Sequence, residues 1–341
     1  IVATGAHRAA WNAVFSQPIP GGPLAVGFDE YFGTDVPNWP PYVFIENDRT
    51  VGIPSEFGAA KLFIKNQASQ QGPALKGWTL EPILPALGDR TAAFIRKEAK
   101  TPEPFLVYMP LTSPHTPLSV NDAWKGKSKL NLYADLVMET DAVVGQVLEA
   151  LEHSGAAKNT LVVFTSDNGC AHYIGVSDLE KKGHYPSGPL RGYKADAWEG
   201  GHRVPFIVRP AVALDTPRVV TRHAVSGADV MPTALALAGQ AIVDGGAPYR
   251  DVWDFKPPAI YAFYAFARAA FGASPAAVRA VEALLLLSTF PAFAILSRRW
   301  VGAAAPGLAG AALAATAVAQ LGFWQTAQPE TFGGVLLAWA L

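Results

Sequence analysis

The chain has 341 residues, carries 27 basic and 28 acidic side chains, and is 50% hydrophobic. This length is sufficient for two domains with buried cores, and the net charge of −1 argues against nucleic-acid binding by bulk electrostatics. The single cysteine, Cys170, excludes an internal disulfide and a cysteine-based zinc cluster.

The predicted elements begin late in the chain. Residues 1–80 are rich in Pro, Gly and aromatic side chains and show little periodicity, which predicts long loops. A short helix is expected over Thr91–Ala99, and the apolar run Pro104–Leu111, bounded by prolines, predicts a buried strand. This strand leads into Thr112–Pro117, which contains His115 and whose prolines exclude a regular element.

A strand and a helix then alternate along the chain. Asn131–Glu152 places its apolar side chains on one side at helical spacing and stops before Gly155, which predicts an amphipathic helix. The β-branched, apolar run Leu161–Thr165 predicts a strand that ends in Ser166–Gly169, and a second short strand is expected over Val204–Val208. This order predicts an α/β fold with a mostly parallel sheet, whose chemistry takes place at the carboxyl ends of the strands.

Polar groups that follow two of these strands are the first candidates for a site. Asp167 and Asn168 offer one charged and one neutral oxygen ligand, which suits Ca²⁺ or Mg²⁺ better than zinc. The same Asp-Asn-Gly sequence is typical of a tight turn, and the local sequence alone favours the turn. His115 is either a functional residue or a histidine of a surface loop, and Cys170 has no neighbouring pattern of a Cys–His nucleophile.

A third segment makes a specific resemblance visible. Leu190–Pro205 reads LRGYKADAWEGGHRVP and resembles the sulfatase pattern L-R-G-x-K-x-x-x-x-E-G-G-x-R-V-P. VVFTSDNG, SPHTP, Gly27–Gly33 (with Tyr31 in place of a Phe) and Asp229–Thr233 are similar to four further segments of that family, in the family's order. Residues 1–239 are therefore similar to a sulfatase catalytic domain, and we expect them to be truncated at the amino terminus.

The resemblance implies an alkaline-phosphatase-like sandwich and hydrolysis of sulfate esters, with a sulfated small molecule or glycan as substrate. By motif match, Asp167 and Asn168 are expected to bind a divalent metal, usually Ca²⁺. His115 is expected to act as general acid at the leaving-group oxygen, and Lys194 to hold the sulfate. Groups of these kinds stabilise the charge that develops on the sulfuryl and leaving-group oxygens.

The sequence also departs from the family. The family's nucleophile is a formylglycine made from the Cys or Ser of a C/S-x-P-S-R motif, and this sequence lacks that motif. It also lacks the family's G-K-x-H-x-G segment and its paired metal-binding aspartates. We therefore expect no turnover from this chain alone. The alternatives are a phosphoester or phosphonate hydrolase of the same superfamily, a membrane glycosyltransferase fragment and a non-catalytic fusion remnant; the Lys194 segment favours sulfate.

The last third of the chain has another composition. Gly246–Pro258 reads GAPYRDVWDFKPP and is similar to a loop of protein-mannosyltransferase-like membrane glycosyltransferases, although its charged side chains could equally form local ion pairs. We expect a linker over 240–258 and membrane-spanning helices over 259–341, with the sulfatase-like part on the periplasmic or extracytoplasmic side. The expected spans are Ala259–Phe271, Ala283–Leu296 and Val301–Phe323.

Overall fold

The structure of the protein is a computed structural model that describes most of the chain. The described residues are 3–60, 62–63, 66–67, 69–210, 258–272 and 275–304, with scattered positions between 225 and 245 and between 308 and 311. The contacts divide the chain into two units, one of residues 1–102 and 106–217 and the other of residues 103–105 and 218–341. His115, Asp167, Asn168 and Lys194 all belong to the first unit.

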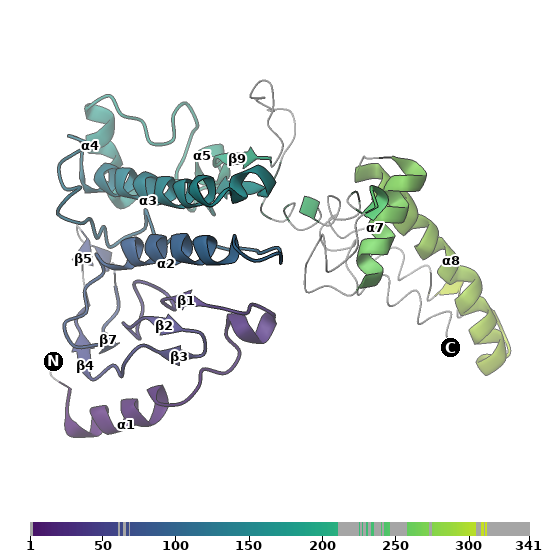
Figure 1. Ribbon diagram of the computed structural model, residues 1–341, viewed down its shortest axis with the longest axis horizontal. Helices are drawn as coiled ribbons and strands as arrows, with labels where there is room; N and C mark the ends of the chain where they lie inside the picture. The colour runs from purple at the N-terminus through teal and green to yellow at the C-terminus, as the bar shows by residue number, and fades with distance from the viewer. Residues whose placement is uncertain are drawn as a thin grey trace. The chain divides into compact units, whose positions relative to one another are not determined.

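Two helices pack side by side at the centre of the first unit, α2 (Ile83–Glu98) and α3 (Leu132–Ser154) (Figure 1). The core between them is apolar, and partly buried side chains of the preceding loops pack against it. Removing this apolar surface from water is the main term that favours folding. The buried members of this cluster are Leu84, Val120, Leu136 and Val143.

The two helices confirm the helical predictions made from sequence. The helix expected over Thr91–Ala99 is the second half of α2. At the start of α3 the side chain of Asn131 accepts a hydrogen bond from the amide of Ala134 at 3.0 Å, which is an N-cap. At its end Gly155 has a φ of 79°, a conformation that glycine adopts without a steric penalty.

Short antiparallel strands and short helices surround this pair. β1, β2 and β3 form one sheet, while β4 pairs with β7, β5 with β6 and β8 with β9. Their bounds are β1 Phe32–Gly33, β2 Ile45–Glu46, β3 Arg49–Thr50, β4 Glu56–Gly58, β5 Leu62–Phe63, β6 Asn66–Gln67, β7 Gly72–Ala74, β8 Val162–Thr165 and β9 Phe206–Arg209. The short helices are η1 Pro23–Val26, η2 Ala156–Asn159, η3 His172–Ile174, α4 Val176–Lys181 and α5 Glu199–His202.

The α/β class is confirmed, whereas the parallel character of the sheet is not shown. Both strands expected at the candidate site exist, as β8 and β9, and they pair antiparallel. Within the described ranges every pair of named strands is antiparallel, and the only parallel bridge joins Tyr42 to Ala74. A mostly parallel sheet therefore stays a prediction.

The expectation that residues 1–80 are loops was wrong for the amino-terminal segment, which forms helix α1 (Gly5–Phe15). This helix begins at a capping box in which the Thr4 hydroxyl accepts from the amide of His7 and the His7 ring accepts from the amide of Thr4. Glu or Gln is the usual N3 residue of a capping box, so His7 at this position does not match the sequence pattern of a helix start.

The strand expected over Pro104–Leu111 was also wrong. These residues form no strand, and the side chains of Leu106 and Tyr108 are 63% and 73% exposed. A strand persists only where a neighbouring strand takes up its amide and carbonyl groups. None of the strands that the structure describes pairs with this segment.

The second unit contains two helices, α7 (Pro258–Phe271) and α8 (Pro275–Val301). In the part of the chain that the structure describes, only Ala276–Val301 is long and apolar enough to cross a membrane, a property that core helices of soluble proteins can share. It contains the predicted span Ala283–Leu296. Most of the predicted span Val301–Phe323, residues 246–257 of the glycosyltransferase-like loop and most of Asp229–Thr233 lie outside the described residues.

The close approach of α2 and α3 predicts the effect of a methyl group at Gly88. A Cβ there would lie 2.8 Å from Cγ1 of Val143 and 2.7 Å from Oε1 of Gln146. Overpacking costs about 1–3 kcal/mol, which outweighs the gain of about 1 kcal/mol from replacing a helical glycine. Gly88→Ala should therefore lower the free energy of unfolding measured with denaturant.

Gly145→Ala on α3 is the matched control for this substitution. Nothing lies within 4 Å of a Cβ at Gly145, so this variant should gain up to about 1 kcal/mol of stability. Equal stabilities of the two variants would contradict the close packing of α2 against α3.

Candidate functional site

The register of β8 and β9 brings two of the sequence motifs to the same place. Thr165, the last residue of β8, lies opposite Phe206, the first residue of β9. Ser166–Gly169 follows β8 directly, and Leu190–Arg203 ends just before β9. The turn with the candidate metal ligands and the loop with the candidate sulfate ligand therefore meet at one end of the strand pair.

Backbone hydrogen bonds join the turn to the loop. The amide of Gly169 donates to the carbonyl oxygen of Gly201 at 2.9 Å. The amide of Lys194 donates to the carbonyl oxygen of Cys170 at 2.8 Å. A Cβ on Gly169 would lie 1.9 Å from the carbonyl oxygen of Gly200. No side chain fits there, because real Cβ atoms do not approach a backbone oxygen within 3 Å.

The loop is folded tightly on itself in the same way. The amide of Gly200 donates to the carbonyl oxygen of Arg191 at 2.8 Å, and a Cβ on Gly200 would lie 2.1 Å from the carbonyl oxygen of Gly192. Glu199 of α5 pairs with Arg203, the residue after this helix, at 2.8 Å, and the guanidinium of Arg191 lies 3.8 Å from the ring centroid of Trp198. The glycines of this motif thus allow the close packing of one backbone segment against another.

Asp167 and Asn168 lie at a bend of the backbone within Ser166–Gly169. Oδ1 of Asp167 accepts from the amide of Asn168 at 2.9 Å, and the side-chain amide of Asn168 donates to the carbonyl oxygen of Gly169 at 3.0 Å. Asp167 is exposed and Asn168 half-buried, so both side chains are accessible from the surface. The turn geometry and a ligand role are compatible, since the carboxylate and amide oxygens have further lone pairs.

The donor set suits a hard cation in kind but not in number. Ca²⁺ takes six to eight oxygen ligands, whereas this turn offers oxygen donors from only two side chains. Across the described residues, no group of three or more His, Cys, Asp or Glu side chains is placed to hold a metal ion. The side chains present therefore do not complete a Ca²⁺ site.

The hydrogen bonding of His115 does not connect it to this junction. Its exposed ring sits between the cis bonds Ser113–Pro114 and Thr116–Pro117, and its Nδ1–H donates to the carbonyl oxygen of Thr116 at 2.6 Å. This bond assigns the proton of the neutral ring to Nδ1 and leaves Nε2 as the acceptor. His115 makes no hydrogen bond with Asp167, Asn168 or Lys194 in the described structure.

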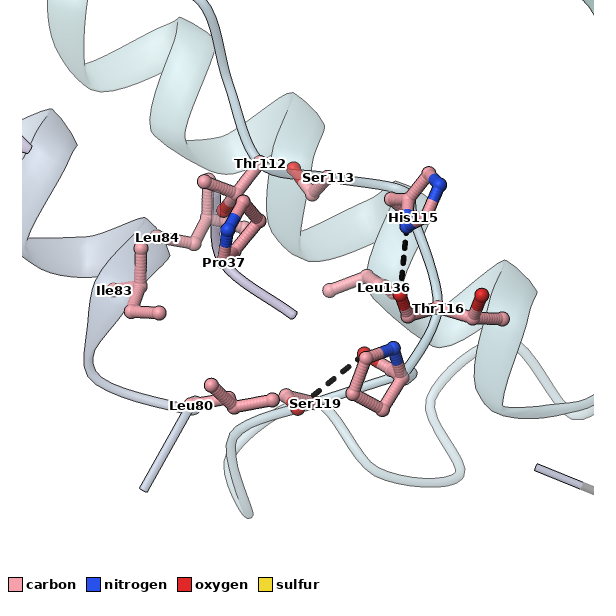
Figure 2. Close-up of a pocket in the computed structure, with 11 residues that line it drawn as sticks. Pro37, Leu80, Ile83, Leu84, Thr112, Ser113, His115, Thr116, Ser119 and Leu136 are labelled. Atoms are coloured by element: carbon pink, nitrogen blue, oxygen red, sulfur yellow. Dashed lines mark hydrogen bonds between the residues drawn. The ribbon is translucent and has the colours of Figure 1, made fainter. Parts of the chain in front are cut away.

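A pocket lies beside His115. Figure 2 shows the apolar side chains of Leu80, Ile83 and Leu84 on one side of it and the loop that carries Ser113 and His115 on the other. The loop is tied to α3, because Oγ1 of Thr140 lies 2.7 Å from Oγ of Ser113.

Lys194 is the half-buried cation of the junction. Its backbone is fixed to Cys170, while its ammonium has no hydrogen-bond or ion-pair partner among the described residues. The neighbouring Tyr193 is fixed as well, since its hydroxyl donates to Oε1 of Glu180 at 2.5 Å. Sequence reasoning missed this pair, because Tyr193 occupies an x position of the motif and Glu180 lies in no motif.

Cys170 is half-buried and lies next to the apolar cluster of Ile174, Val176 and Leu179. Burial raises the pKa of its thiol, while a contact of Sγ with Oγ of Ser187 at 3.7 Å opposes this rise. A reactive cysteine needs a lowered pKa. The chemistry of this thiol therefore agrees with the absence of a nucleophile pattern around it.

Comparisons with known proteins agree on one family. The sequence profile of the sulfatase family matches residues 36–240. Steryl-sulfatase of Rattus norvegicus is 37% identical over 183 residues, which are 52% of this chain and 30% of the relative. The N-acetylgalactosamine-6-O-sulfatase of Bacteroides thetaiotaomicron is 32% identical over 175 residues, which are 50% of this chain and 33% of the relative. The chain thus spans about a third of the length of either relative.

A solved structure extends the likeness to the fold. It belongs to a Bacteroides thetaiotaomicron core genetic locus for the metabolism of multiple glycosaminoglycans, and it matches with a TM-score of 0.51 at 26% identity. The match covers 58% of this chain and 48% of the other. None of these matches supports the glycosyltransferase-like resemblance of Gly246–Pro258, which stays a prediction.

The contact between turn and loop predicts the effect of Gly169→Ala. The added methyl group must push Gly200 away and break the bonds from Gly169 to Gly201 and from Lys194 to Cys170. Each such bond contributes about 1 kcal/mol, so amide hydrogen exchange at Lys194 should become at least about tenfold faster. Gly145→Ala is the control, and unchanged exchange in Gly169→Ala would refute the contact.

The raised pKa of Cys170 predicts slow alkylation. At neutral pH the folded chain has a smaller fraction of thiolate at Cys170 than the unfolded chain has. The rate of reaction with iodoacetamide should therefore rise at a higher pH in the folded protein than in the denatured protein. Ser187→Ala should move the inflection higher still, because Ser187 lowers the pKa. An inflection below that of the denatured protein would show a reactive thiol instead.

Proposed function

The chain belongs to the sulfatase family, and on this premise we propose that residues 1–239 are part of a catalytic domain that hydrolyses sulfate esters. The observation that supports this most directly is the contact of two motif segments, in which the loop of Lys194 is hydrogen-bonded to the turn of Asp167 and Asn168. The loop supplies a cation and the turn supplies oxygen donors. A bound sulfate and its counter-cation require these two kinds of group side by side.

Lys194 holds the sulfate in this proposal. Its ammonium is half-buried and has no partner in the described part of the chain, so an anion would meet a charge that no carboxylate has neutralised. Hydrogen bonds between an ammonium and an anionic oxygen are about twice as strong as neutral ones. The same charge stabilises the sulfuryl oxygens when negative charge spreads over them during cleavage of the S–O bond.

His115 is the proposed general acid. The bond from Nδ1–H to the carbonyl oxygen of Thr116 orients the ring. When the ring is an imidazolium, this bond occupies the Nδ1 proton, and the Nε2 proton is the one that is donated to the leaving-group oxygen. After transfer, the neutral ring keeps its remaining proton on Nδ1, where the carbonyl oxygen accepts it. Thr116 thus determines which nitrogen exchanges the proton.

Asp167 and Asn168 are the proposed metal ligands, with Ca²⁺ as the expected ion. Two oxygen donors bind such an ion weakly, so we infer that the metal site of this chain needs further ligands. The sequence also lacks the C/S-x-P-S-R motif that would provide the nucleophile. We therefore propose that the chain alone binds sulfate but does not turn over a sulfate ester.

The carboxyl-terminal part has a separate proposed role as a membrane anchor. We propose that residues 259–341 are membrane helices behind a linker at 240–258, because Ala276–Val301 has the length and composition of a span. The sulfatase-like part would then lie on the periplasmic or extracytoplasmic side. Partition of the chain into detergent or vesicles would test this assignment.

The proposed role of Lys194 predicts a change in sulfate affinity. Lys194→Ala removes a charged hydrogen bond of about 1.5–3 kcal/mol, so calorimetric titration with inorganic sulfate should show binding at least about tenfold weaker. Lys158→Ala, at an exposed lysine of η2, is the control and should bind as the unsubstituted chain does. Equal affinities of all three proteins would contradict the proposal.

The proposed lack of turnover is tested with an aryl sulfate. The chain should release no more of the phenol than buffer does, because no group in its sequence can become the family's nucleophile. A rate above background that disappears in Lys194→Ala would show that the chain is active by itself.

A further inference from the structure

The residue before Lys194 is fixed at every polar atom that it has. The amide of Tyr193 donates to Oδ2 of Asp196 at 2.9 Å, and its carbonyl oxygen accepts from the amide of Asp196 at 2.9 Å. Its hydroxyl donates to Oε1 of Glu180 at 2.5 Å. Its ring packs edge-on to His172, with 5.4 Å between the centroids.

Glu180 belongs to a helix that is itself held firmly. It is a residue of α4, whose Val176 and Leu179 are 2% and 0% exposed. The side-chain amide of Asn131, the cap of α3, donates to the carbonyl oxygen of Ile174 at 3.0 Å and ties this region to the central helix pair. A continuous series of contacts therefore leads from α3 through α4 and Tyr193 to the backbone of Lys194.

Charge strengthens the bond between the two side chains. The hydrogen bond to Glu180, together with burial, raises the pKa of Tyr193 to about 12. Because the raised pKa favours the neutral phenol, the bond contributes stability below the ordinary pKa of tyrosine, and this contribution is lost as the pH rises through about 12. Tyr193 thus stays a donor at neutral pH.

We propose that the Tyr193–Glu180 hydrogen bond positions Lys194 for the sulfate, so that both residues are positioning residues of the site. The inference rests on the proposed function, since it assumes that Lys194 holds the anion. A long ammonium side chain on a loosely held backbone loses rotamer and backbone freedom when it binds. Fixing the preceding residue removes part of that loss before the anion arrives.

A purely structural role of the ring makes a different prediction. If Tyr193 served only to fill the space beside Ile174, Val176 and Leu179, phenylalanine would replace it without effect on Lys194. If the hydroxyl positions Lys194, Tyr193→Phe and Glu180→Ala should act alike, and Glu180→Gln should retain the function because its carbonyl oxygen still accepts the bond.

The first measurement is hydrogen exchange of the Lys194 amide in the full chain. Tyr193→Phe and Glu180→Ala should each raise the rate about tenfold, whereas Glu180→Gln should stay within about threefold of the original protein. Tyr185→Phe is the matched control, since the Tyr185 side chain is 59% exposed. Unchanged exchange in both disruptive variants would overturn the inference.

The second measurement is the protection of the Lys194 amine by inorganic sulfate against an amine-reactive ester, read by mass spectrometry. Protection should weaken in Tyr193→Phe and Glu180→Ala and persist in Glu180→Gln. Faster exchange with unchanged protection would show a structural role and overturn the inference. Absence of protection in the original protein would contradict the proposed function instead, so the two failures are distinguishable.

Discussion

The candidate site depends on one constraint: the backbone of the Ser166–Gly169 turn lies directly against the backbone of the Leu190–Arg203 loop, with no side chain between them. A single methyl group on Gly169 would lie 1.9 Å from the carbonyl oxygen of Gly200. At that separation the turn and the loop can exchange two backbone hydrogen bonds, and the short helix α5 is the only regular element within either segment. The glycines therefore determine where Lys194 lies relative to Asp167.

This contact explains how a few hydrogen-bonded loops present charged groups in a defined arrangement. β8 and β9 supply the frame, because their antiparallel register sets the end of one strand against the start of the other. α4 then holds the loop from a second direction through Tyr193. The backbone of Lys194 thus has two independent supports, while its ammonium has no partner among the described residues and is free to meet an anion.

Sequence reasoning located the segments of the site well and its supporting contacts poorly. α3 was predicted because its apolar periodicity and its stop at Gly155 are local signals, whereas its cap at Asn131 became apparent only in the structure. β8 and β9 were predicted as apolar runs, but their antiparallel pairing depends on which strands meet in space. The carbonyl oxygens that the motif glycines approach are visible only in the structure.

The predictions that were wrong or missing share a physical cause. Pro104–Leu111 has the composition of a strand but no strand partner among the described residues, and pairing is not a property of the segment itself. The Tyr193–Glu180 bond joins residues that no motif connects, so no pattern in the sequence indicates it. The roles of His115, Asp167, Asn168 and Lys194 stay predictions, because they depend on a sulfate and a cation.

The most direct test of the account is a sulfate titration of the chain followed by NMR of its backbone amides. If the turn and the loop form one anion site, the shifts should move at residues 166–170 and 190–203 with a single affinity, while α2 and the core of α3 stay unchanged. Movement of the loop without the turn, or shifts spread over unrelated surface lysines, would contradict the central claim that the two motifs act as one site.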